Sequence, residues 1–491
     1  MTQPPPAIEK VETPPYYDVE QRRTLLISGL AIVVGIAAVG VARLLIAAIA
    51  LVTNLSFHGR FSVFDATPTH NHLGIFVVIV PVIGGLIVGL LARYGSGAIR
   101  GHGIPEAMEQ ILINESRISP KVTVLKPLSA AIAIGTGGPF GAEGPIIATG
   151  GALGSLVGQL LHTTPDERKT LLAAGAAAGM AAIFGTPVAA VLLAIELLLF
   201  EYRPRSLVPV ALASATATGI RMVFEGSAGV FAMPQLTQPS GEALTAYMFL
   251  GAIVGFAAVF VTRSLYYIEE AFEKLPVHWM WWPAIGAIVV GVVGYFEPRT
   301  LGVGYDNISN ILAGNLLDSV LLSLVILKFI SWSIALGSGT SGGTLAPLFT
   351  IGGGLGALLG VACVHWFPGL GVDPRIAALV GMAAIFAGAS RALLTSVVFA
   401  FETTRQPIGL LPLLGGCTAA FIISSLMMRY TIMTEKLARR GTHVPTEYIA
   451  APPEEIARRD AAAIRHRHFD IPVELGGARK DPREARQTEI L

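Results

Sequence analysis

Charged residues are scarce in this chain. Only 14% of its 491 residues are Asp, Glu, Lys or Arg, against about 25% in ordinary soluble proteins. Hydrophobic residues make up 53% of the chain, and glycines number 55. This composition excludes an ordinary soluble fold and favours an integral membrane protein. The net charge of +1 offers no basic surface to a nucleic-acid partner.

Cysteine and recognisable metal or catalytic patterns are also scarce. Cys363 and Cys417 are the only cysteines, and both lie in apolar stretches, which excludes a disulfide framework or a cysteine metal site. His70 and His72 have Asp65 nearby but no evident third ligand. The sequence has no HExxH, no GxSxG and no paired aspartates on an apolar segment. We therefore expect no metal and no cofactor, and an intramembrane enzyme is only a remote alternative.

Long hydrophobic runs recur along the chain, and their lengths differ. Several reach the roughly 20 residues that span a bilayer, whereas others are short and broken by glycine. Runs of the second kind predict half-spanning or re-entrant helices, which are typical of transporters. The predicted fold is therefore an all-α polytopic membrane protein. Two of the long runs cover 171–200 and 376–400.

The distribution of Lys and Arg predicts an orientation in the membrane. Basic residues cluster at 21–23, at 203–205 and throughout 436–485, whereas none occurs from residue 222 to residue 262. By the positive-inside rule, both termini are cytoplasmic and the 224–243 loop lies outside. The first 23 residues are Pro-rich and charged and lack the pattern of a removable signal peptide. We expect a bacterial inner membrane location.

The chain contains an internal repeat. With one offset of 202 residues, Lys126 corresponds to Lys328, 141–158 corresponds to 343–360, and GMAAIF at 179–184 recurs at 381–386. The predicted organisation is a cytoplasmic N-terminal tail (1–23), a first transmembrane repeat (24–223), an extracytoplasmic loop (224–243), a second repeat (244–440) and a cytoplasmic polar tail (441–491). The two lysines are expected to be structural or vestibule charges on the cytoplasmic side and not substrate ligands, because snorkelling near helix ends lowers the cost of burying them. Glycines spaced by four residues in 150–158 and 352–360 predict close helix packing.

Three glycine-rich loops each lead into an apolar helix. They are GHGIPEAME at 101–109, GTGGPFGAEGPII at 135–147 and GSGTSGGTLAPLF at 337–349. Pro105, Pro145 and Pro347 occupy positions that suit the first turn of a helix. Helix starts present unpaired N–H groups and a positive dipole end. Three such starts that converge in a membrane predict a small-anion site; the alternative for any one loop is a simple re-entrant turn.

Glu143 is the carboxylate in the second of these loops. An ionisable residue inside a membrane indicates a functional site. Ionised, it can occupy an anion site itself; protonated, it can leave, which makes it both a plug and a proton carrier. The alternative is an acid that merely stabilises a helix start. The repeat argues against this alternative, because the corresponding position is Leu345 and the fold therefore does not require an acid there.

These loops resemble the motifs of the CLC family of chloride channels and chloride/proton antiporters. GHGIPE is similar to GSGIP, GAEGP to GxEGP with Glu143 as the gating glutamate, and GTLAP to GxFxP. The resemblance covers about 24–441 and implies a homodimer, with two inverted-topology repeats whose re-entrant helices meet at a midplane anion site in each subunit. The tail is too short for paired CBS domains. The anion-binding positions that the resemblance implies are His102, Gly103, Ile104, Gly144, Thr344, Leu345 and Met433.

Four positions depart from the family pattern. By the resemblance, His102 replaces the motif-one serine, Met433 the late tyrosine, Leu345 the aromatic residue of motif three, and Leu197 the inner proton-transfer glutamate. Tyr430, three residues before Met433, is the alternative for the late tyrosine if the helix is shifted. A histidine can both donate and accept hydrogen bonds, which suits an anion such as bicarbonate. Chloride is the default substrate and bicarbonate or another small anion the alternative. Whether the protein is a channel or an exchanger, passive or proton-coupled, stays open.

Overall fold

The computed structural model describes residues 16–442 and 444–445. Eight helices in this part of the chain are long and apolar enough to cross a membrane, and no strand occurs among the described residues. This confirms the predicted all-α polytopic fold. The predicted N-terminal tail up to residue 15 and nearly all of the predicted tail 441–491 lie outside the described residues.

The first half of the chain forms eight α-helices. They are α1 (Tyr16–Thr53), α2 (Ile79–Tyr94), α3 (Ile104–Ile113), α4 (Pro120–Gly135), α5 (Glu143–Leu160), α6 (Pro165–Phe184), α7 (Pro187–Leu193) and α8 (Pro204–Glu225). A π-helical turn, η5 (Ala194–Leu199), continues α7. The described part of α1 thus begins before residue 24.

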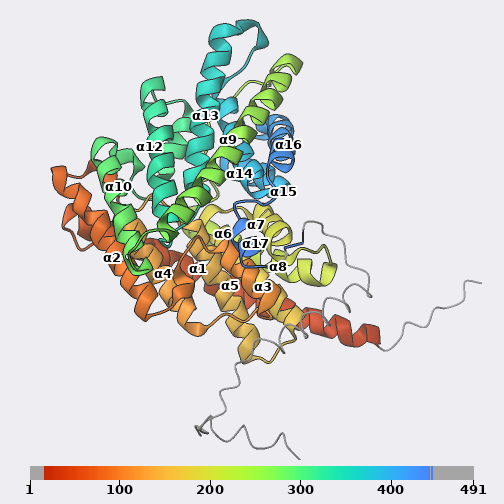
Figure 1. The fold of residues 1–491 in the computed structure, drawn as a ribbon. Helices are drawn as coiled ribbons and strands as arrows, with labels where there is room; N and C mark the ends of the chain where they lie inside the picture. Colours follow the sequence, from red (N-terminus) through yellow and green to blue (C-terminus); the bar gives the residue numbers. More distant parts are fainter. Residues whose placement is uncertain (1–15, 443, 446–491) are drawn as a thin grey trace, which may run out of the picture. The chain divides into compact units, whose positions relative to one another are not determined.

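The second half follows the same order and adds a short final helix (Figure 1). It comprises α9 (Gly241–Glu273), α10 (Trp282–Phe296), α11 (Tyr305–Ala313), α12 (Asp318–Gly337), α13 (Leu345–Trp366), α14 (Pro374–Ser390), α15 (Leu393–Thr404), α16 (Leu410–Met427) and α17 (Glu435–Arg439). Short 3-10 or π turns lie at Asn54–His58, Pro68–His70, Gly74–Val78, Gly97–Ile99, Trp279–Trp281, Pro298–Thr300, Pro368–Leu370 and Pro407–Gly409.

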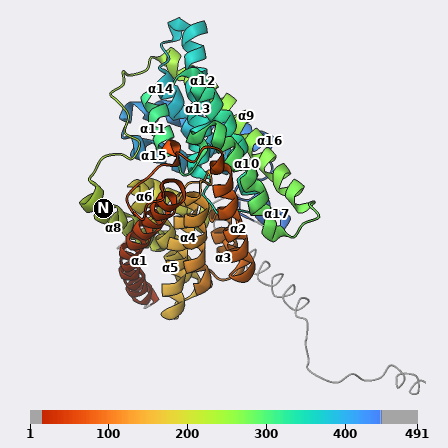
Figure 2. The same cartoon turned by 90° about the vertical axis from the view of Figure 1, so that its left-hand side faces the viewer.

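The two halves have inverted topology. The loops that precede α5 and α13 pair in an antiparallel bridge between Gly141 and Gly343. From this junction the two helices run apart: in Figures 1 and 2, α3, α4 and α5 lie to one side of it and α12, α13 and α14 to the other. Equivalent helices of the two halves therefore point in opposite directions, and short helices such as α3 and α11 begin at the interior without spanning the membrane.

The glycine stripes bring neighbouring helices into backbone contact. A Cβ atom on Gly150 or Gly154 of α5 would overlap backbone atoms of α6, at Gly175 and Leu171. Gly352 and Gly356 of α13 face the backbone of α14 in the same way. The packing prediction for these glycines is confirmed, and the close approach holds α5 and α13 rigidly behind their N-termini.

The apolar runs 171–200 and 376–400 each form two helices. In 171–200, α6 ends at Gly185, which has a positive φ of 62°, and Pro187 opens α7. In 376–400, α14 ends at Arg391, with φ of 61°, before α15. The breaks are local backbone events that hydropathy does not register.

Candidate anion-binding site

Backbone contacts join the three glycine-rich loops. The Gly343 N–H donates a hydrogen bond to the Gly141 carbonyl at 3.0 Å, which ties the second loop to the third. Gly101 and Ser341 form a parallel bridge, which ties the first loop to the third. The loops lie far apart in the sequence, and their meeting places the starts of α3, α5 and α13 around one point.

Glycine is required where the loops touch. A Cβ atom on Gly144 would overlap the His102 carbonyl, and one on Gly103 would overlap the Gly144 carbonyl. Gly103 also has a φ of 98°, which side chains rarely adopt. At Gly343 a Cβ atom would come within 2.8 Å of the Glu143 carboxylate. These positions carry glycine because backbone and carboxylate occupy the space that a side chain would need.

The predicted helix starts are confirmed. Helices α3, α5 and α13 begin at Ile104, Glu143 and Leu345, one or two residues before their prolines. The first N–H groups of a helix have no partner within it. The positive ends of α5 and α13 therefore face the junction from opposite sides, and this arrangement favours a small anion there.

Glu143 occupies this junction. Its side chain is 0% exposed, and its Oε1 atom accepts a hydrogen bond from the Tyr305 hydroxyl at 3.0 Å. The backbone N–H of Ala346, in the first turn of α13, also faces the carboxylate. A carboxylate from the first repeat thus lies over the helix start of the second repeat, where a small anion would be stabilised for the same reasons.

The other predicted site residues are distributed around the same loops. His102, Ile104, Gly144, Thr344, Leu345 and Met433 are all buried. The His102 ring lies beside the backbone of Ile432, so the loop before α17 joins the site. The N–H of Gly103, by contrast, donates to Glu106 Oε2 at 2.7 Å. That group is therefore not free for an anion in this structure.

Four buried polar side-chain atoms in these loops have no hydrogen-bond partner. They are His102 Nδ1, Glu143 Oε2, Ser341 Oγ and Thr344 Oγ1. Buried polar atoms in proteins are nearly always paired, and unpaired ones need an explanation such as an ion or a water. These four atoms are polar groups at the junction that could pair with a ligand or a water.

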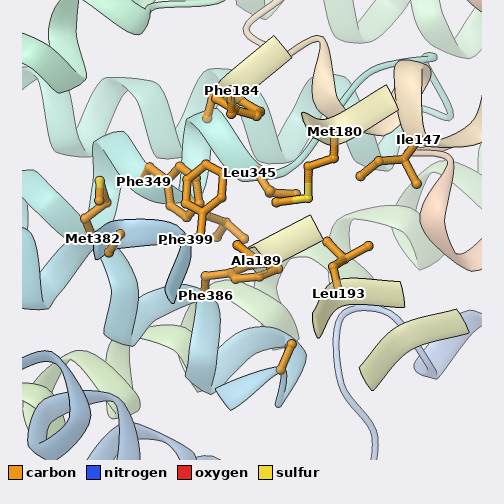
Figure 3. Close-up of a cluster of buried hydrophobic side chains, with 14 of the residues drawn as sticks. Ile147, Met180, Phe184, Ala189, Leu193, Leu345, Phe349, Met382, Phe386 and Phe399 are labelled. Atoms are coloured by element: carbon orange, nitrogen blue, oxygen red, sulfur yellow. The ribbon is translucent and has the colours of Figure 1, made fainter. Parts of the chain in front are cut away.

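Apolar side chains pack around Leu345 at the start of α13. Figure 3 shows Leu345 between Phe349 and Met180, with Phe184 and Phe399 on neighbouring helices. These side chains are buried and come from both halves of the chain. Electrostatic interactions are strengthened in such a dry surrounding, because little water screens them.

Comparison with known proteins identifies the family. The family model described as voltage gated chloride channel matches residues 84–425. The chain belongs to the CLC family. CLC proteins are transporters and channels of membranes, so the intramembrane-enzyme alternative is rejected, and the protein is an integral membrane protein.

Curated relatives and solved structures agree with the CLC assignment. The chain is 28% identical over 366 residues to a putative chloride channel protein ClcB-like of Ralstonia nicotianae, covering 74% of this chain and 85% of the relative. It is 31% identical over 363 residues to the H(+)/Cl(-) exchange transporter ClcA of Yersinia pestis, covering 71% of this chain and 74% of the relative. The fold matches a slow cyanobacterial Cl-/H+ antiporter with a TM-score of 0.75 at 23% identity, covering 85% of this chain and 98% of the antiporter. It also matches a eukaryotic CLC transporter with a TM-score of 0.71 at 22% identity, covering 87% of this chain and 76% of the transporter.

The two repeat-related lysines of this CLC protein are completely buried. Lys126 Nζ donates to the carbonyls of Ile99 and Gly101, both at 2.8 Å. Lys328 Nζ donates to the carbonyls of Thr300 and Gly302 at 2.9 and 3.2 Å. The expectation that they snorkel was wrong, because backbone carbonyls of the loops before α3 and α11 solvate the ammonium groups instead of water. Their structural role is the same in both halves.

The position at which the family resemblance leads us to expect an inner glutamate carries an apolar residue. Leu197 lies in η5 and is buried. The neighbouring Glu196 is engaged with the N–H groups of Leu394 and Thr395 and with the Thr395 hydroxyl. Its carboxylate is therefore committed to the start of α15.

Two tyrosines near the site were not predicted from the sequence. Tyr305 bonds Glu143, and Tyr266 of α9 donates its hydroxyl to the Ile432 carbonyl at 2.8 Å. Tyr305 had a signal in the repeat: GVGYD at 302–306 follows the pattern of GHGIP at 101–105, with an offset one residue shorter than that of the lysines. Tyr266 had none, because it stands in a long apolar helix like any other aromatic residue.

Proposed function

We propose that this CLC protein moves small monovalent anions across a bacterial inner membrane, with chloride as the default substrate. The observation that carries the proposal is the Glu143 carboxylate at the junction of the α5 and α13 N-termini. A site that stabilises one buried carboxylate charge through helix ends is suited to a small anion of the same charge. The curated relatives named as chloride transporters support chloride as the substrate.

Glu143 acts as the gate in this proposal. While ionised, it fills the anion position and blocks the pathway. Protonation removes the charge that holds it against the helix ends, so it leaves and an anion enters. The anion then contacts the first N–H groups of α5 and α13, with His102, Thr344 and Leu345 around the inner part of the site.

Proton coupling is a separate question from anion movement. The Yersinia pestis relative is named an exchange transporter, whereas this chain has Leu197 where an inner carboxylate would be expected from the family resemblance. Because a buried leucine carries no proton, we propose a pathway in which Glu143 responds to pH without a second proton station.

Bicarbonate is the second candidate substrate. His102 Nδ1 is buried and unpartnered, and a neutral imidazole can donate or accept through such an atom. Bicarbonate both donates and accepts hydrogen bonds, whereas a halide only accepts. An unpaired ring nitrogen in the site therefore favours testing bicarbonate beside chloride.

The family assignment supports a proposal for the remaining architecture. We propose a homodimer with one pathway per subunit, both termini in the cytoplasm and repeats at 24–223 and 244–440. The Lys and Arg distribution supports the orientation. Cysteine-accessibility labelling in the 224–243 loop of spheroplasts tests the orientation, and cross-linking in detergent tests the dimer.

Flux from reconstituted liposomes tests the function. Vesicles loaded with chloride, bicarbonate, nitrate or fluoride are compared with protein-free vesicles while external pH is recorded and a proton gradient is imposed. Chloride or bicarbonate flux above the protein-free control is expected, without uphill movement driven by protons. Proton-driven uphill chloride flux would reject the uncoupled pathway, and absence of flux for all four anions would reject anion transport.

A further inference from the structure

Tyr305 contacts the gate from the second half of the chain. It is the first residue of α11, and Gly304 before it adopts a left-handed conformation with φ of 76°. This turn brings the Tyr305 hydroxyl to Glu143, to which it donates a hydrogen bond at 3.0 Å. The donor is thus supplied by a residue 162 positions away in the sequence.

The Tyr305 ring is held in place by aromatic neighbours. It packs edge-on against Phe184, with ring centroids 5.7 Å apart, and against Phe231, at 5.8 Å. Phe184 in turn packs against Phe399 at 5.0 Å. Because these rings are interlocked, the hydroxyl keeps its position when its acceptor changes.

In the proposed gating, the acceptor at this position changes when an anion replaces the Glu143 carboxylate. A carboxylate oxygen and a small anion both accept a single O–H donor, so a fixed hydroxyl that bonds the ionised Glu143 can bond an anion that replaces it. His102 and Met433 provide no hydroxyl to the site. We infer that the Tyr305 hydroxyl is a side-chain donor to the transported anion at the position that the Glu143 carboxylate occupies. This inference rests on the proposed function.

Anion binding to a variant without the gate carboxylate tests the inference. In Glu143→Ala the anion position is free of the carboxylate. The double variant Glu143→Ala with Tyr305→Phe differs from Glu143→Ala only by the loss of the Tyr305 hydroxyl. Each purified variant is titrated calorimetrically with chloride and separately with nitrate. We expect the added Tyr305→Phe change to weaken binding about tenfold to a hundredfold, which is the usual contribution of a hydrogen bond to a charged group.

Tyr247 provides the matched control. Its buried hydroxyl accepts the Asp373 N–H at 2.8 Å, and it contacts none of the three glycine-rich loops through that bond. Tyr247→Phe in the Glu143→Ala background should leave anion affinity unchanged. Size-exclusion profiles of all variants report whether the fold is kept, and Tyr305→Phe retains the ring that packs on Phe184.

The outcomes separate this inference from the proposed function. If Glu143→Ala binds chloride or nitrate and Tyr305→Phe leaves the affinity within twofold, the inference is wrong while anion binding stands. Equal losses in the Tyr305 and Tyr247 variants would also overturn it, because the effect would then be general. If no variant binds either anion and the wild type carries no flux, the proposed function fails and the inference fails with it.

Discussion

Glu196 and Glu402 each cap a helix in the other half of the protein. The Glu196 carboxylate, in η5, accepts the N–H groups of Leu394 and Thr395 at 3.0 and 2.9 Å at the start of α15. The Glu402 carboxylate, in α15, accepts the first two free N–H groups of α7 at 3.1 and 2.9 Å. The repeats therefore stabilise one another through reciprocal helix caps, in addition to their apolar packing.

Removing one of these caps should destabilise the protein. Glu196→Ala leaves two N–H groups of α15 without an acceptor, and we expect the free energy of unfolding to fall by about 1–3 kcal/mol. Thermal melting followed by size-exclusion chromatography in detergent measures the change. Glu242→Ala, at an exposed position on α9, is the control. Equal melting temperatures for the two variants would show that the cap contributes little.

Glu143→Gln should make the pathway insensitive to pH. Glutamine mimics the neutral acid, so it lacks the charge that attracts the helix ends at neutral pH. In the wild type, anion flux should rise as pH falls, because protonation opens the gate; in the variant, flux at acidic and neutral pH should be equal. Liposome flux at both values measures this, with Glu242→Gln as control. A pH response that survives in Glu143→Gln would remove this residue from the gate.

His102→Ser should change the order of preferred anions. Serine restores a single small hydroxyl and removes the buried Nδ1 atom, so the ratio of chloride to bicarbonate flux should rise about tenfold, which corresponds to one hydrogen bond. Relative fluxes from vesicles with equal protein content give the ratio. An unchanged ratio would leave residue 102 with only a backbone role in the site.

Gly144→Ala should strongly reduce transport, whereas another helical glycine should tolerate the same change. The added methyl group at residue 144 would overlap the His102 carbonyl and force apart the first and second loops. We expect at least a roughly tenfold loss of flux. Gly219→Ala, in α8, meets no atom within 4 Å and serves as the control. Full flux from Gly144→Ala would show that the loops need not touch for transport.

Hydropathy depends on the residues within one segment, and a repeat is found by comparing one segment with another. Neither requires the tertiary structure, so both could be determined from the sequence. The low charge predicted a membrane protein, and the common offset that relates Lys126 to Lys328 revealed the duplication. The three helix starts followed from glycine and proline chemistry. Glu143 stood out because an acid in such a loop has no counterpart at Leu345.

The direction of the repeats and the surroundings of the lysines depended on tertiary structure. Lys126 lies in an apolar segment, and its sequence neighbours suggest snorkelling. The carbonyls that accept hydrogen bonds from its ammonium group belong to residues 99 and 101, in the loop before α3. Likewise, the helix breaks at Gly185 and Arg391 are changes of backbone conformation, which the hydrophobicity of the surrounding side chains does not predict.

The sequence by itself determined that this is a duplicated membrane protein with three anion-suited helix starts and a carboxylate in one of them. Only the tertiary structure decided which atoms meet that carboxylate: the Tyr305 hydroxyl from α11 and the backbone N–H of Ala346 in the first turn of α13. The physical reason is that helix formation and membrane partitioning depend on residues near in sequence. The site is formed by the antiparallel meeting of two inverted repeats, in which residues distant along the chain become neighbours.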